Sequence, residues 1–304
     1  MTGIVAGKVA IVSGAGRGIG RAIAILMAQQ GASVVVNDIG AALDGSGGDA
    51  GPAQQVVDEI KAAGGAAIAS TLSVGEPDNA ARIVQDAIDA FGRVDILVNN
   101  AGILRDRIFH RMEWSDWADV IAVHLHGAFA MSRAVAGRFR EQGSGAMVHM
   151  TSTSALIGNL GQANYMAAKM GIVGLSRGIA LDMARFGVRS NAVAPFAWGR
   201  MIGSLPSETE AEKQRVTRFQ QMTPETVAPL VVYLASDRAE GVSGQIVSVR
   251  NNEIFLFGQT RPIRSIHRGD GWTPERLETQ FKGAFGPSLT PLDVSTDVFS
   301  WDPI

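Results

Sequence analysis

The sequence predicts an α/β fold in which a doubly wound parallel sheet is covered by helices on both faces. Short runs of Val, Ile and Ala alternate with longer helical patterns through the first two-thirds of the 304 residues. These runs are nearly continuous in apolar residues, as expected of strands that are buried on both faces. No repeat or linker divides the chain, so we expect a single domain followed by a carboxyl-terminal extension.

The strands and helices are expected in strict alternation along the chain. The strands cover residues 9–12, 34–36, 66–68, 94–98, 147–150 and 188–193. The helical patterns between them include residues 19–30, 53–63, 80–91 and 115–140. Such strand–helix–strand units imply a parallel sheet, and their right-handed crossovers make it doubly wound.

Two segments break this alternation. Residues 195–223 form a long stretch interrupted by glycines and a proline, and a loop of this length in a compact domain is usually functional. We therefore expect it to be a substrate loop. Residues 258–304 are rich in Gly, Pro and Arg and predict one helix at 274–282. The expected domain thus covers 1–257, and the extension covers 258–304.

Composition narrows the class of protein. The chain is 46% hydrophobic and 18% charged, which is enough for a large core, and its net charge of −2 argues against a general nucleic-acid binder. It contains no cysteine, which excludes disulfides and thiolate metal sites, and we predict no metal. No apolar run approaches the roughly 20 residues of a membrane span, and residues 1–8 do not resemble a signal peptide. We expect a cytoplasmic protein with no membrane insertion and no nucleic-acid partner.

A glycine-rich turn follows the first expected strand and opens the first helix, at residues 13–20. Glycines let the backbone turn tightly and approach a phosphate, and the helix N-terminus offers free N–H groups to a dinucleotide pyrophosphate. The alternative is a tight turn without a ligand, but the position between strand and helix favours the cofactor. The expected contacts are Gly14, Arg17, Gly18, Ile19 and Gly20.

Two further strand ends complete the expected cofactor site. Asp38 ends the second strand, where a carboxylate accepts hydrogen bonds from the adenosine ribose and repels a 2′-phosphate, so we predict NAD. A solvated turn aspartate before Gly40 is the alternative. Residues 99–102 follow the fourth strand, where small residues let a cofactor lie close. The expected contacts there are Asn100, Ala101 and Gly102.

The expected reacting groups lie farther along the chain. Tyr165 and Lys169 are four residues apart on a predicted helix, hence on one face, and Ser152 lies thirteen positions before the tyrosine. A phenol has a pKa near 10, and a nearby ammonium lowers it. We therefore predict that Tyr165 removes the proton of an alcohol while Ser152 positions it. A surface Tyr–Lys pair is the alternative. The second tyrosine, Tyr233, is expected in the core.

Taken together, these motifs resemble the short-chain dehydrogenase/reductase family. Residues 13–20, Asp38, 99–102, Ser152, Tyr165 and Lys169 occur in that family's order and spacing, over roughly residues 7–250. The resemblance implies a Rossmann-type fold and a nicotinamide cofactor whose ribose is held by Tyr165 and Lys169. It also implies a homodimer or homotetramer, assembled through long helices that flank the active site.

Four stretches are similar to one branch of that family, namely residues 34–40, 103–106, 123–127 and 158–165. They resemble the (3R)-hydroxyacyl-CoA dehydrogenase part of multifunctional enzyme type 2 and actinobacterial hydroxysteroid or hydroxyacyl-CoA dehydrogenases. The resemblance implies an NAD-dependent oxidoreductase acting on a secondary alcohol or ketone, such as a 3-hydroxyacyl-CoA or a steroid-degradation intermediate. The alternatives are a hydroxysteroid dehydrogenase acting on a free substrate, and a catalytically silent NAD-binding subunit.

Three positions depart from the family pattern. His124 stands where the family has an asparagine that helps to hold a water in the proton path, so we expect His124 to assist catalysis. Pro195 and Ala197 flank a phenylalanine where the family has Pro-Gly, and we expect them to contact the nicotinamide. Ser73 and Val74 occupy the place of an acidic residue near the adenine and are expected to contact it instead.

The substrate pocket is expected between residues 154–160, residues 196–205 and the extension. Its apolar candidates are Phe196, Trp198, Met201 and Ile202, with a packed loop core as the alternative. Four arginines are candidates for the phosphates of a CoA thioester, with a solvated surface as the alternative. They are Arg105, Arg107, Arg111 and Arg200.

Overall fold

The structure, a computed structural model, describes residues 3–197, 209, 216–217 and 219–303. Most of the expected substrate loop therefore lies outside the described residues. Trp198, Arg200, Met201 and Ile202 are among the positions that lie outside them. The expectations for these four side chains stay predictions.

One eight-stranded sheet forms the centre of the molecule, in the order β3-β2-β1-β4-β5-β6-β7-β8. The first seven strands are parallel, and β8 pairs antiparallel to β7. The strands are β1 Val9–Ser13, β2 Ser33–Asn37, β3 Ala66–Ser70, β4 Ile96–Asn99, β5 Gly145–Met150, β6 Val188–Phe196, β7 Ile246–Arg250 and β8 Glu253–Phe257. The doubly wound sheet is confirmed, and β7 and β8 are additional strands that the sequence analysis did not predict.

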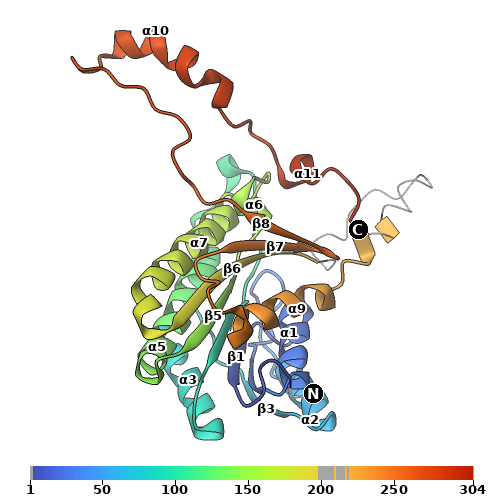
Figure 1. Ribbon diagram of the computed structural model, residues 1–304. Coiled ribbons are helices and arrows are strands. Elements are labelled where there is room, and N and C mark those ends of the chain that lie inside the picture. The colour runs from blue at the N-terminus through green and yellow to red at the C-terminus, as the bar shows by residue number, and fades with distance from the viewer. Residues whose placement is uncertain (1–2, 198–208, 210–215, 218, 304) are drawn as a thin grey trace.

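Helices cover both faces of the sheet, as the ribbon shows (Figure 1). One face carries α1 Gly18–Gln29, α2 Gly51–Ala62 and α9 Pro224–Ala235. The other carries α3 Pro77–Phe91, α5 Gly127–Gln142 and α7 Ala163–Met183. The shorter elements are η1 Phe109–Arg111, α4 Trp114–Ile121, the π-helical turn η2 Ala122–His126, α6 Thr153–Leu156, η3 Ala184–Phe186, η4 Asp237–Ala239, α10 Pro274–Phe285, η5 Gly286–Ser288 and α11 Ser295–Val298.

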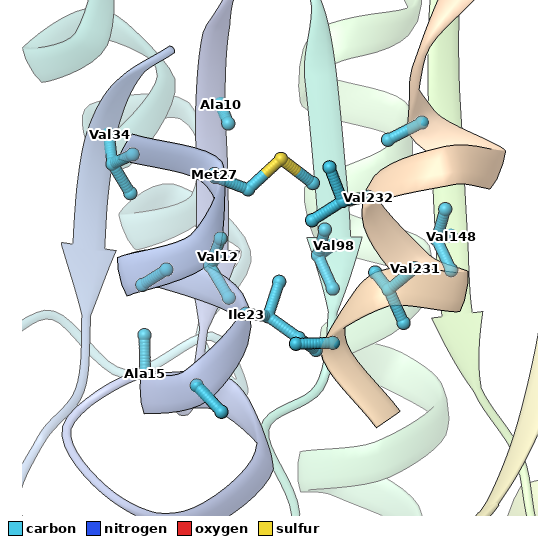
Figure 2. Packing of buried hydrophobic residues seen from close by; sticks show 14 of the residues in the cluster. Ala10, Val12, Ala15, Ile23, Met27, Val34, Val98, Val148, Val231 and Val232 are labelled. Carbon is cyan, nitrogen blue, oxygen red and sulfur yellow. The ribbon is translucent and has the colours of Figure 1, made fainter. Parts of the chain in front are cut away.

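Adjacent strand residues supply two separate apolar cores, because successive side chains of a strand point to opposite faces. Val12 packs with Ile23 of α1 and Val231 of α9 on one face (Figure 2). Its neighbour Ile11 belongs to the second cluster, with Phe139 of α5. All of these side chains are fully buried, and each contributes roughly 1.5–3 kcal/mol of transfer free energy. The two cores thus anchor the strands from both faces of the sheet.

The continuous stretch Trp114–Gln142, which joins α4, η2 and α5, is long and apolar enough to cross a membrane by composition alone, with a mean hydropathy of 1.2. Apolar helices of a protein core meet the same criterion. Here 39% of the most apolar window is buried, and the stretch packs against α3 and α7. Its buried side chains, Met131, Val135 and Phe139 among them, thus serve packing within this fold.

Two expectations about the later part of the chain have different outcomes. The helix expected at 274–282 is present as α10, which extends to Phe285. Tyr233 is 42% exposed, so the expectation of a core position is wrong. On α9 Val231 is fully buried, and a helix of 3.6 residues per turn places Tyr233, two residues later, on the opposite side.

Candidate active site

The expected cofactor and reacting residues lie at the carboxyl ends of five neighbouring parallel strands. The order β2-β1-β4-β5-β6 brings these ends to one edge of the sheet. In open α/β sheets, ligands bind at this edge, where the strand order reverses. The segments that meet here, at or just after the ends of those strands, are Asp38, the turn 13–20, residues 99–102, Ser152 and residues 195–197.

The glycine-rich turn has the backbone geometry that the sequence predicted. Gly14 and Gly18 adopt φ values of +63° and +53°, a region that other residues avoid. A Cβ on Gly20 would lie 2.1 Å from the Gly14 carbonyl oxygen, whereas a Cβ on Gly18 would meet nothing within 4 Å. The turn is therefore closed toward the sheet and open in front of α1.

Helix α1 begins in this open space without a side-chain cap at Arg17. The first N–H groups of a helix have no partner within the helix and carry partial positive charge. No acidic residue occupies the first turn of α1. The turn thus fits the pyrophosphate of a dinucleotide, with the backbone of Gly18, Ile19 and Gly20 supplying the donors.

Ser13 and Asn100 tie the turn to the end of β4. The Asn100 side-chain amide donates to the carbonyl oxygens of Ser13 and Gly14, each at 3.0 Å. The Ser13 hydroxyl accepts the backbone N–H groups of Asn100 and Ala101 at 3.0 and 3.1 Å. The Asn100 side chain therefore fixes the position of the glycine-rich turn. The turn and the end of β4 are in close contact, since a Cβ on Gly14 would lie 2.8 Å from the Ala101 Cα.

The carboxylate of Asp38 is fixed beside the same turn. One oxygen accepts the Gly16 N–H at 2.8 Å, and the other accepts the Gly40 N–H at 2.7 Å. Each carboxylate oxygen has a further lone pair. The partly buried Asp38 thus places a negative charge where an adenosine ribose would meet the end of β2.

The remaining expected cofactor contacts, Ser73, Val74, Pro195 and Ala197, all have contacts within the protein. Ser73 accepts the Gly75 N–H at 3.3 Å, and Val74 is 6% exposed. Pro195 lies within β6, in register with Val249 of β7, while Ala197 packs against the core. Ser73, Pro195 and Ala197 are partly exposed at the carboxyl ends of β3 and β6.

Ser152, Tyr165 and Lys169 come together at the end of β5. Tyr165 and Lys169 lie one turn apart on α7 and are only 8% and 4% exposed. The Lys169 ammonium donates to the Met150 carbonyl oxygen at 2.7 Å and lies 5.6 Å from the centre of the Tyr165 ring. Ser152 caps α6 and accepts the Ser154 N–H at 3.1 Å.

The electrostatics of Tyr165 differ from the expectation. Burial raises the pKa of Tyr165 to about 12, since the phenolate loses its hydration; a side-chain hydrogen bond with Ser152 opposes this increase, and the Asp106 charge adds to it. Burial also lowers the pKa of Lys169 to about 7. The expectation that Lys169 lowers the pKa of Tyr165 is thus wrong for this structure, because desolvation outweighs any charge effect.

His124 lies inside the site rather than at its surface. Its ring is 3% exposed and meets the Tyr165 ring edge-on, with centres 5.3 Å apart. Nε2 lies 2.8 Å from the Ile103 carbonyl oxygen, while the buried Nδ1 has no hydrogen-bond partner among the described residues. Burial and the nearby Lys169 charge lower the pKa of His124 to about 3, so the imidazole is neutral.

The structure adds positioning residues that sequence reasoning missed. Asn164 is fully buried, donates to the carbonyl oxygens of Arg105 and Asp116 at 3.0 and 2.8 Å, and accepts the Tyr165 N–H at 2.8 Å. Gln162 donates to Asp106 at 2.7 Å. These contacts fix the start of α7. The only sequence signal is a run of amide side chains just before Tyr165, whose partners lie far away along the chain.

Two of the arginines considered for CoA phosphates have other partners. Arg105 pairs with Asp119 at 3.0 Å, and Arg107 pairs with Asp116 at 2.8 Å. Arg111 is exposed, and Arg200 lies outside the described residues. The described part of the chain therefore offers Arg111 as the remaining candidate of this group.

Comparison with known proteins places this chain among dehydrogenases and reductases. The family model described as enoyl-(acyl carrier protein) reductase matches residues 14–251. A short-chain type dehydrogenase/reductase of Mycobacterium tuberculosis is 45% identical over 254 residues, covering 83% of this chain and 86% of that protein. The peroxisomal multifunctional enzyme type 2 of Drosophila melanogaster is 43% identical over 243 residues, covering 80% of this chain and 39% of that enzyme.

The crystal structure of a short chain dehydrogenase from Mycobacterium avium agrees in fold and sequence. It is 41% identical with a TM-score of 0.84, and the match covers 96% of this chain and 99% of that chain. The likeness therefore includes the carboxyl-terminal extension. By contrast, the match to the fly multifunctional enzyme covers 39% of that enzyme.

Proposed function

The chain belongs to the short-chain dehydrogenase/reductase family, and from that premise we propose that it transfers a hydride between NAD and a secondary alcohol or ketone of a lipid-derived substrate. The observation that carries this proposal is the meeting of Ser152, Tyr165 and Lys169 beside the glycine-rich turn. The first two supply a hydroxyl and a phenol for one substrate oxygen. The third is a buried amine one turn from the phenol.

The chain's own residues move the proton. When NAD or NADH is bound, its nicotinamide accepts or supplies the hydride. Because its pKa is raised to about 12, Tyr165 is a protonated phenol at neutral pH and donates to the oxygen of a ketone as that oxygen gains charge. In oxidation, the Tyr165 phenolate takes the alcohol proton. Ser152 positions the oxygen, and Lys169, with a pKa near 7, holds the ribose and exchanges protons.

His124 is proposed to assist this proton transfer. Its Nε2 lies 2.8 Å from the carbonyl oxygen and 3.0 Å from the backbone nitrogen of Ile103, and its buried Nδ1, in the ring that meets Tyr165 edge-on, has no hydrogen-bond partner among the described residues. A hydrogen-bonding nitrogen there can hold a water that delivers protons toward Lys169. The histidine then takes the place of the asparagine of the family pattern.

The fixed carboxylate of Asp38 supports NAD as the cofactor. A 2′-phosphate at the ribose would meet this negative charge at close range, whereas ribose hydroxyls would donate to it. We predict that the wild type binds NADH tightly and NADPH weakly. In Asp38→Asn the difference between the two dissociation constants should be smaller, and fluorescence titration measures both. Asp49→Asn, an exposed carboxylate of the neighbouring loop, serves as the control. Equal binding of both nucleotides by the wild type would contradict the assignment.

Acyl thioesters are the proposed substrate class. The matching family model is named for an acyl-carrier-protein reductase, and a multifunctional peroxisomal enzyme is among the relatives. We propose a 3-hydroxyacyl-CoA or a steroid-degradation intermediate. The test is oxidation of a 3-hydroxyacyl-CoA with NAD, compared with the corresponding free acid. A preference for the thioester supports the proposal, and equal rates count against it.

A hydroxysteroid or another free lipid alcohol is the second candidate substrate. This candidate is favoured because Arg105 and Arg107 are already paired with carboxylates and are therefore less available to bind the phosphates of CoA. Rapid oxidation of a steroid alcohol, with no activity on any thioester, would select this candidate.

We also propose that the protein acts in the cytoplasm as a homodimer or homotetramer. Support comes from α5 and α7, which leave Phe129, Met170 and Leu181 exposed by 56%, 45% and 72%. Large apolar side chains exposed on helices are typical of subunit contacts. Light scattering of the purified protein tests the subunit number, and a monomeric mass would contradict it.

A further inference from the structure

A second cavity lies away from the proposed reaction site, between α7 and the strands β6, β7 and β8, which are neighbours in Figure 1. Its volume is about 130 Å³, and none of the proposed cofactor contacts or reacting residues is among the described residues that line it. On β6 the cavity touches Ala192, roughly 13 Å along the strand from Phe196 at its carboxyl end, at about 3.3 Å per residue. The cavity therefore lies beside the middle of the sheet and not at its cofactor edge.

The charge of this cavity comes from Arg177 of α7. Among the described residues that line the cavity, it is the charged one, and neither Asp nor Glu is present. Arg177 is half-buried and has no ion pair or hydrogen bond within the described part of the chain. A guanidinium keeps its charge and offers five N–H donors, and losing part of its hydration without a partner costs free energy. An anion in the cavity would offset that cost.

The neighbouring Ser176 hydroxyl is left as a donor by a buried chain of hydrogen bonds. The chain runs from Asn99 through His149 and Ser190 to Ser176, over distances of 3.1, 3.1 and 2.9 Å. The Asn99 amide nitrogen can only donate, so Nδ1 of His149 accepts, and Nε2 carries the hydrogen that Ser190 accepts. Ser190 then donates to Ser176, whose own hydrogen has no other partner among the described residues. That hydrogen is available to an acceptor in the cavity.

Two amide side chains add further donors, and the rest of the lining is largely apolar. Gln245 and Gln259 donate to the backbone carbonyl oxygens of Ser243 and Gly244, and each amide nitrogen has a second hydrogen. The large apolar side chains of the lining are Leu156, Met170, Val173, Ile246 and Phe257. An anionic head group with a short apolar chain matches both parts of this lining.

Charge and volume narrow the class of ligand. A single guanidinium matches one negative charge, and its planar fork suits the two oxygens of a carboxylate. A protein cavity of about 150 Å³ holds one benzene molecule, so the space here suits a chain of about four to six carbons. We propose that this cavity binds a small aliphatic monocarboxylate, with its oxygens on Arg177 and Ser176 and its chain against the apolar wall.

Hexanoate is the probe that tests this site, by titration calorimetry of the full chain in saturating NADH. Arg177→Met should weaken hexanoate binding about 10–100-fold, since it removes a charged hydrogen-bonding partner. Arg177→Lys keeps the charge without the fork and should be intermediate. Arg133→Met, which removes an exposed arginine of α5, is the matched control and should bind as the wild type does. Unchanged affinity in Arg177→Met, or no binding by the wild type, would overturn the proposal.

Ligands of the same length test the head group. Hexan-1-ol keeps the apolar chain and lacks the charge, so the wild type should bind it about tenfold or more weakly than hexanoate. In Arg177→Met the two ligands should bind alike. Equal affinity of the wild type for both would show that the cavity recognises the chain alone, and would contradict an anion site.

Hydrogen–deuterium exchange locates the ligand. Hexanoate should slow exchange in peptides covering 170–177 and 256–260, and should leave peptides of the glycine-rich turn unchanged. Protection confined to residues 13–20 and 99–102 would place the carboxylate in the cofactor site and overturn the proposal. Because this test needs no turnover, it holds whether or not the chain oxidises the proposed substrates.

A carboxylate of a second copy of the chain is the competing occupant. Met170, which lines the cavity, also belongs to the apolar surface assigned to subunit contacts. Light scattering separates the two, because Arg177→Met should keep the mass of the wild type if the cavity holds a small ligand. A lower mass in Arg177→Met, with no hexanoate binding to the wild type, would assign Arg177 to a subunit contact and overturn the proposal.

Discussion

Tyr165 shows how burial changes the chemistry that sequence spacing suggests. The spacing of Tyr165 and Lys169 places both on one face of α7, and the structure brings them together. The expected lowering of the tyrosine pKa does not follow from that spacing, because both groups are buried and desolvation acts on each. A phenol that stays protonated is suited to donate a proton to a ketone.

This raised pKa predicts opposite pH dependence for the two reaction directions. Alcohol oxidation needs the Tyr165 phenolate, whose fraction grows with pH up to a pKa of about 12, so kcat/KM for oxidation should rise continuously from pH 7 to pH 10. Ketone reduction needs the protonated phenol and should not increase over the same range. Steady-state rates in both directions measure this. A pH-independent oxidation rate would contradict the role given to Tyr165.

Sequence reasoning reached the reacting residues because their spacing along one strand and one helix is local. It missed Asn164 and Gln162, since their partners Asp116 and Asp106 come from a segment some fifty residues earlier in the chain. The buried state of His124 was also not predictable from spacing, because it depends on how η2 packs against residues 102–103.

At the scale of elements, the predicted helix 115–140 exists but contains the π-helical turn η2. This turn carries His124, whose ring fills the space above Gly102. Apolar periodicity does not reveal one extra residue in a helical turn, whereas π-helical turns occur frequently at functional sites. This π-helical turn places the His124 ring against Gly102 and Ile103, just after the end of β4.

Gly102→Ala should therefore destabilise the protein. The new Cβ would lie 2.3 Å from Cε1 of His124, a buried ring that cannot move freely, and such overpacking costs about 1–3 kcal/mol. Urea unfolding measures the change. Gly137→Ala is the control, since a Cβ at that position in α5 meets nothing within 4 Å and the substitution should stabilise the helix by up to about 1 kcal/mol. A neutral Gly102→Ala would contradict the packing described here.

The hairpin of β7 and β8 was missed although the sequence contains a signal for it. Asn251 adopts a φ of +55° between the two strands, and an Asn-containing two-residue turn between apolar runs is typical of a hairpin. Because β8 is antiparallel, it does not belong to the strand–helix alternation on which the other assignments depended. This hairpin presents Arg250 and Glu253 to the returning extension.

At the scale of the whole molecule, the fold class and six strands followed from apolar runs alone, whereas the course of the extension did not. Its return depends on Phe299 and Trp301 meeting a buried arginine from another element. Contacts between segments so far apart in sequence leave no local pattern. The length of the chain and its composition predict an extension but not what it covers.

Stability of the whole molecule should decrease in mild acid. Burial lowers the pKa of His149 to about 4, while the unfolded chain keeps the ordinary value of 6.5. Between these values the unfolded state binds more protons, so stability rises with pH and is lost as the pH falls from 6.5 toward 4. The buried, neutral His124 acts in the same direction.

Urea unfolding at several pH values measures this effect. In His149→Gln, the loss of unfolding free energy between pH 6.5 and pH 4 should be smaller by up to about 3 kcal/mol, since each tenfold change in proton affinity is worth roughly 1.4 kcal/mol. His126→Gln, which alters an exposed histidine, is the control and should follow the wild type. An identical pH dependence in the His149 variant and the wild type would show that this histidine does not control acid stability.

We propose that this chain is an NAD-dependent dehydrogenase in which Tyr165 moves the proton. The measurement that tests it most directly is NADH formation from a 3-hydroxyacyl-CoA by the wild type and by Tyr165→Phe, with NADH binding measured on both. We predict turnover by the wild type, a loss of about 10²–10⁴-fold in the variant, and equal NADH affinity. Undiminished turnover in Tyr165→Phe, or a wild type that binds NADH and oxidises no tested alcohol, would contradict this assignment of function.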